Sequence, residues 1–109
     1  MNESEFDALA NAALARIEAA LEKAVDESDA DFDYAMVSAG VLEIEFEDGS
    51  KIIVNRHGAA QEIWVAARSG GFHFRWDGSA WRDTRDGGEL MQALSRLVSA
   101  QAGVGLSLG

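Results

Sequence analysis

Apolar residues recur every three or four positions between residues 4 and 25, which is the period of an α-helix. The apolar stripe consists of Phe6, Leu9, Ala10, Ala13, Ile17, Ala20, Leu21 and Ala24. Asn2 or Ser4 can cap the start of this helix, and Glu5 or Asp7, three residues further on, can complete a capping box. The pattern predicts a long amphipathic helix that packs one face on a core.

Strands dominate the middle of the chain. Residues 41–47 alternate almost strictly, with Leu42, Ile44 and Phe46 on one face and three glutamates on the other. Asp48-Gly49 is a strong hairpin turn, so residues 51–55 are predicted to form the return strand. Four further strands are predicted at about residues 31–37, 61–68, 71–76 and 80–84.

A second helix is predicted at Glu89–Ala102, with Gly103 as its C-cap and a small apolar tail that packs loosely or frays. The order is therefore one helix, about six strands and one helix. Consecutive hairpins imply a mainly antiparallel sheet, and two amphipathic helices can cover one of its faces. The sequence predicts a single α+β domain over residues 1–109, a two-layer α/β sandwich.

Composition narrows the class of protein. The chain has three Trp and five Phe, which indicates a globular protein, and no cysteine, which excludes disulfides and thiolate metal sites. No apolar run is long enough to span a membrane. The first five residues resemble neither a signal peptide nor an organelle presequence, so a cytoplasmic location is expected.

The negative charge is concentrated in the first third of the chain. Residues 1–33 carry ten acidic and two basic residues, a net charge of −8, whereas the rest carries nine and seven, a net of −2. Such a surface should repel nucleic acid and anionic membranes and attract cations or basic protein patches. The alternative is a solvated acidic face that only maintains solubility.

The spacing of these acids suits weak cation binding. Asp29, Asp31 and Asp33 can line one edge of an extended segment, and Glu18 and Glu22 lie one helical turn apart. Carboxylates are hard oxygen ligands, and an open site binds hydrated cations weakly. This geometry does not select iron over calcium, magnesium or manganese.

An EF-hand is excluded by the sequence. A loop that started at Asp29 would place Tyr34 where glycine is needed and Gly40 where the bidentate glutamate belongs.

Trp64 is a second candidate feature, because strand alternation places it on the polar face with Glu62. An exposed tryptophan is typical of a binding hot spot, so we expect partner contact. The alternative is shielding by stacking with Arg68 or Arg75.

No catalytic signature is present, and the protein is not expected to be an enzyme. His57 and His73 are the only histidines, and we interpret both as surface or hydrogen-bonding residues rather than metal ligands. Phe72, Phe74 and Trp76 alternate and are predicted to be core residues.

Several stretches resemble the frataxins, most closely their bacterial members. These are residues 48–56, 61–66 and 70–74, with Ser4-Glu5-Phe6 near the start and Gln101-Ala102-Gly103 near the end. The resemblance covers nearly the whole chain. It implies an α/β sandwich with both helices on one face of the sheet, and a role in iron–sulfur cluster assembly.

The resemblance also implies a site. Frataxins bind iron, ferrous or ferric, weakly through an acidic ridge, and they bind and modulate the cysteine desulfurase of the assembly machinery, with the cluster scaffold protein as a further candidate partner. Carried over by position, the ridge comprises Glu18, Glu22, Asp26, Glu27, Asp29, Asp31 and Asp33. Glu18 and Glu22 would also contact the desulfurase, and Asn55 and Trp64 are the expected partner contacts on the sheet.

The chain departs from the family in three places. It has no proline, so the loop after Asn55-Arg56 lacks the one usually found there. Ala19 and Lys23 occupy positions where close relatives often carry acids. About three extra residues lie near Tyr34–Ala39.

Four functions remain open from the sequence. The leading one is an iron-binding regulator or iron donor, expected to be a monomer, with iron-driven oligomers as an alternative state. The second is a protein–protein modulator whose metal binding is incidental. The third is a ferroxidase that stores iron in oligomers. The fourth, an acidic mimic of nucleic acid, has no support from Trp64.

Overall fold

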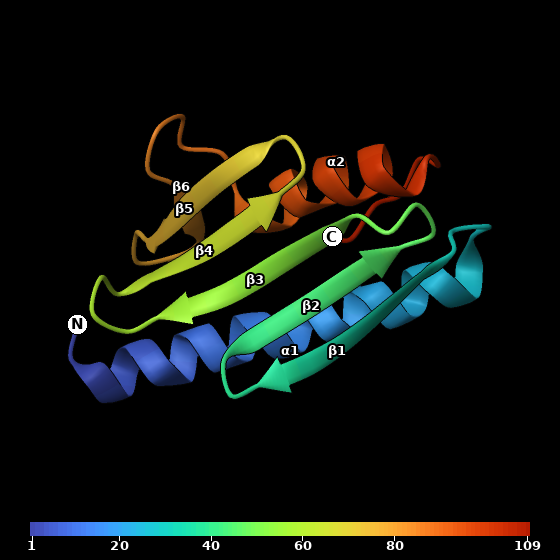
Figure 1. Ribbon diagram of the computed structural model, residues 1–109. Coiled ribbons are helices and arrows are strands. Elements are labelled where there is room, and N and C mark those ends of the chain that lie inside the picture. The colour runs from blue at the N-terminus through green and yellow to red at the C-terminus, as the bar shows by residue number, and fades with distance from the viewer.

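The structure is a computed structural model that describes residues 1–109. Its elements are α1 (Glu3–Glu27), β1 (Phe32–Ser38), β2 (Val41–Phe46), β3 (Lys51–His57), β4 (Glu62–Ala67), β5 (Gly70–Trp76), β6 (Trp81–Asp83) and α2 (Leu90–Ala102). Each strand pairs antiparallel with the next, so the sheet order is β1-β2-β3-β4-β5-β6. Both helices lie against the same face of the sheet (Figure 1). The predicted α+β sandwich is confirmed.

The core lies between the helices and the sheet. Alternate residues of the strands face it, and α1 contributes Phe6, Ala10, Leu14, Ile17, Leu21 and Ala24. Leu14, which the predicted stripe omitted, is buried, whereas Leu9, Ala13 and Ala20 are only half-buried. Neither helix combines the length and apolar character that crossing a membrane requires.

The start of α1 follows the predicted capping box. The backbone N–H of Glu5 donates to the Asn2 side chain at 2.8 Å, and the N–H of Asn2 donates to the Glu5 carboxylate at 3.3 Å. At its other end, α1 has no basic residue in its last turn. Asp26 and Glu27 therefore lie where the helix dipole already places negative charge, which is electrostatically unfavourable.

In the β1–β2 hairpin, β1 has the seven residues predicted for it, but it is shifted by one position and ends at Ser38. The register shifts between Met36 and Ser38, so the ladder contains a bulge at this point. Met36 and Val37 are 40% and 55% exposed. Residues 34–39, where extra residues were expected, thus form the end of β1 and the exposed tip of the hairpin at the edge of the sheet.

The expectation that the tail is loose was wrong. Leu108 is buried, and the N–H groups of Leu106 and Leu108 donate to the hydroxyls of Ser99 and Ser95 at 2.9 and 2.8 Å. Two serines one turn apart on α2 therefore supply acceptors for a tail that runs back along the helix. Gly103 is the C-cap as predicted, with φ of 76°.

Candidate metal and partner site

The acidic ridge extends over the second half of α1, the loop that follows and the start of β1. Its seven carboxylates are those of Glu18, Glu22, Asp26, Glu27, Asp29, Asp31 and Asp33. Glu18 is half-buried and the other six are exposed. None of the seven takes part in an ion pair or accepts a hydrogen bond within the protein. Their full charge is therefore available to external ligands.

Tyr34 joins the helical part of the ridge to β1. Its cross-strand partner is Ile44, which is buried, so its ring lies on the helix side of the sheet. Glu18, Glu22 and Tyr34 together line a shallow hollow. Desolvation raises the pKa of the Tyr34 phenol, and the nearby charges of Glu22, Asp26 and Glu18 raise it further. Tyr34 was not among the residues predicted for the site.

The strand part of the ridge faces the other way. Phe32 is buried on the core side, so Asp33 points to the open face of the sheet, where it lies opposite Glu45 of β2. The ridge therefore has two branches, one on each side of the edge strand β1. One consists of helical carboxylates around Tyr34, and the other of strand carboxylates beside Glu45.

The geometry of the ridge is open. No group of three or more Asp, Glu or His side chains in the structure could hold one metal ion. A cation bound here would be held by one or two carboxylates and by water, and such coordination gives weak binding.

Trp64 lies on the open sheet face between two histidines. The His57 ring stacks on one side of the indole at 3.7 Å between centroids, and the His73 ring on the other at 4.4 Å. Both ring faces of Trp64 are therefore covered, which is the shielding considered as the alternative to partner contact, but histidines provide it and not Arg68 or Arg75. Asn55 is the cross-strand neighbour of Trp64, so the two predicted partner contacts lie side by side.

A buried carboxylate fixes the orientation of Trp64. Glu62 is only 6% exposed and accepts from the Trp64 Nε1–H at 2.8 Å and from Arg75 Nη2 at 2.7 Å. Its other neighbour is His73, whose Nδ1 lies 3.5 Å from the carboxylate. Burial acts to raise the pKa of Glu62, but the hydrogen bonds from Trp64 and Arg75 outweigh it and hold that pKa below its ordinary value.

The loop without proline is held by His57. The backbone N–H of Ala60 donates to His57 Nδ1 at 3.2 Å, and Gln61 adopts a left-handed φ of 53° just before β4. His57 thus both closes the loop and stacks on Trp64. His57 accepts a hydrogen bond and His73 is exposed, as interpreted from the sequence, but the stacking of both rings on Trp64 was not predicted.

We expect Glu62→Gln to destabilise the protein by about 1–2 kcal/mol at pH 7, because it removes a buried, charge-assisted acceptor. The folded-state pKa of Glu62 is lowered, so its contribution is present above the unfolded pKa of about 4.5 and is lost as the pH falls through the folded value. Urea unfolding at pH 7 and at about pH 3 measures both effects.

The matched control for this substitution is Glu47→Gln, since Glu47 is exposed and unpaired. It should change the free energy of unfolding little at either pH. A loss for Glu62→Gln that is the same at both pH values would contradict the assigned role of the charge.

Sequence comparison assigns the chain to a family. Residues 1–104 match the model of the frataxin-like domain, so the chain belongs to the frataxin-like family, as the short motifs indicated. Its curated relatives include the iron-sulfur cluster assembly protein CyaY of Dechloromonas aromatica. The two are 65% identical over 108 residues, which cover 99% of each chain.

Solved structures agree with this assignment. The frataxin of Psychromonas ingrahamii matches with a TM-score of 0.84 and 31% identity, over 100% of this chain and 99% of that one. A trimeric frataxin of Saccharomyces cerevisiae, described as complexed with ferrous iron, matches with a TM-score of 0.73 over 94% of this chain and 88% of that one. At 23% identity, the yeast structure shows a shared fold only.

Proposed function

We propose that this protein is a non-enzymatic, iron-binding regulator of iron–sulfur cluster assembly that modulates the cysteine desulfurase. Relatives that match it over nearly their whole length are named as iron-sulfur cluster assembly proteins. The observation that carries the proposal is the ridge, where seven neighbouring carboxylates have no partner within the protein.

Some acidic residues outside the ridge form ion pairs, whereas others, such as Glu45 and Glu47, are exposed and unpaired as the ridge acids are. Glu43, Asp48, Glu62 and Asp77 each have a basic partner. The ridge has none, although α1 also carries basic residues. Clustered like charges destabilise a fold, so an external cation or a basic protein surface would stabilise it by binding there.

The openness of the ridge fits a donor or sensor, because a weakly held ion can be released. The choice of iron over other cations rests on the family, since carboxylate geometry alone does not make it. The same carboxylates would dock a basic patch of the desulfurase, while Asn55 and Trp64 would form a second contact on the sheet, for the desulfurase or the scaffold protein. Docking of this kind is fast and weakens as salt rises.

NMR titration with ferrous iron under anaerobic conditions tests the proposal, with magnesium as the control ion. We expect paramagnetic broadening confined to residues 18–34, at iron concentrations where magnesium has little effect. Signals of Trp64 and the β4–β5 turn serve as internal references. An equal response to both ions, or no response on the ridge, would overturn the iron assignment.

The structure favours a second candidate function in one respect. Because no three ligand groups converge, the ridge also fits a protein–protein modulator whose metal binding is incidental. In that case desulfurase binding would be the same with and without iron. A ferroxidase gains no support, since closely spaced metal centres need converging ligands that this chain does not present.

A further inference from the structure

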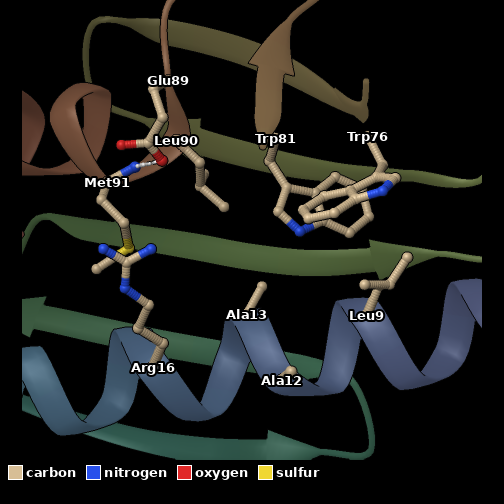
Figure 2. A pocket seen from close by; sticks show the side chains of 9 residues that line it. All are labelled: Leu9, Ala12, Ala13, Arg16, Trp76, Trp81, Glu89, Leu90 and Met91. Atoms are coloured by element: carbon tan, nitrogen blue, oxygen red, sulfur yellow. Dashed lines mark hydrogen bonds between the residues drawn. The ribbon is translucent and has the colours of Figure 1, made fainter. Parts of the chain in front are cut away.

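A cavity of about 170 Å³ opens between α1, the start of α2 and the strands β5 and β6. Figure 2 shows its walls: α1 below, the start of α2 on one side, and two indoles from the sheet. The apolar lining includes Leu9, Ala13, Trp76, Trp81, Leu90 and Met91. Nothing in the proposed function uses this cavity.

The size and walls of the cavity suit one aromatic ring. An engineered apolar cavity of about 150 Å³ is enough to bind benzene. Trp76 and Trp81 meet edge to face, with centroids 5.6 Å apart, and aromatic walls favour an aromatic guest. The small side chain of Ala13 leaves the space open on the α1 side.

The two charged groups at the cavity differ in whether they are already paired. The carboxylate of Glu89 accepts from the N–H of Met91 at 2.8 Å, so it caps the start of α2, where the helix dipole also stabilises it. Arg16, in contrast, makes no ion pair and no side-chain hydrogen bond in the protein. It is thus a cation without an ion-pair partner beside an apolar hollow, although Gly109 at the end of the tail also lies near its guanidinium.

We propose that this cavity is a binding site for a small aromatic carboxylate, whose ring lies against Trp76 and Trp81 and whose carboxylate pairs with Arg16. A planar carboxylate matches the guanidinium in geometry and charge. The site is small and partly open, so the dissociation constant is expected to be on the order of 1 mM.

NMR titration with three probes separates the contributions. Phenylacetate has both ring and charge, phenylacetamide has the ring alone, and acetate has the charge alone. We expect saturable shifts of Leu9, Ala13, Met91 and the Trp76 and Trp81 indole N–H signals with phenylacetate. Phenylacetamide should bind about fivefold more weakly, because an exposed ion pair contributes modestly, and acetate should cause no saturable shift at these residues.

Two substitutions and one control make the test specific. Arg16→Gln should weaken phenylacetate to the level of phenylacetamide, whereas Arg96→Gln, which removes another exposed and unpaired arginine, should not. Ala13→Leu should fill the cavity and abolish binding of both aromatic probes. If that variant does not fold, the Arg16→Gln result alone tests the proposal.

Three outcomes would overturn the proposal: equal binding of phenylacetate and phenylacetamide, an equal loss of binding in both arginine variants, or no saturable shift up to about 10 mM.

Discussion

Reversing Glu18 and Glu22 to lysine is expected to weaken binding of the cysteine desulfurase at least about a hundredfold. The two carboxylates lie one turn apart on α1 and have no internal partners, so they can face a basic patch directly. Close charge pairs across interfaces contribute about 1.5 kcal/mol or more each, and two such losses correspond to about a hundredfold. Titration calorimetry at two salt concentrations measures the effect.

The matched control is Glu3→Lys with Asp7→Lys. These residues are also four apart on α1 and change the net charge equally, but they lie about 22 Å away along the helix. They should weaken binding only a few-fold, mainly through slower association at low salt. If both double variants lost affinity equally, only the total charge would matter, and docking on the ridge would be refuted.

Leu21→Ala is expected to have the largest effect on stability, a loss of about 3 kcal/mol in the free energy of unfolding. Leu21 has no exposed surface and lies between the ridge positions on α1, so the substitution leaves a cavity under the helix that carries the site. For a domain of this size the melting temperature should fall by about 10–20 °C. Urea unfolding gives the free energy directly.

Leu106→Ala removes the same side-chain atoms from the tail, where the leucine is only half-buried. Its cost should be about 1 kcal/mol. Equal losses in the two variants would mean that α1 is not anchored through Leu21 as the structure shows. The iron titration repeated on folded Leu21→Ala reports whether the ridge depends on that anchoring.

The pattern of apolar residues predicted the fold because both of its periods are local. Strict alternation in β2 and the Asp48-Gly49 turn define one hairpin, and each later turn defines the next. The prediction of α1 depended only on the helical spacing of its apolar residues. Predicted and observed boundaries agree within two residues, and the largest differences are at the C-terminal ends of α1 and β3. The bulge in β1 was not predicted, because a bulge leaves no mark on the alternation of apolar residues.

Side-chain contacts between distant segments could not be predicted in the same way. The stacking of His57 and His73 on Trp64 depends on the register of three strands, which local pattern does not give. Tyr34 joins the ridge only because β1 crosses the end of α1 that carries the acids. The absence of ion pairs in the ridge could not be predicted from the sequence either, because Arg16 and Lys23 lie close in sequence to its acids.

Because β1 lies at the edge of the sheet, its carboxylates also affect how the protein associates with other extended chains. An edge strand offers free backbone N–H and C=O groups to any other extended chain, and charge and bulges are common defences against such pairing. β1 carries both, with Asp33 on the strand and the register shift near Met36. These features guard an otherwise apolar hairpin tip against aggregation. Acid, which neutralises the carboxylates, should therefore promote strand-to-strand association of this protein through β1.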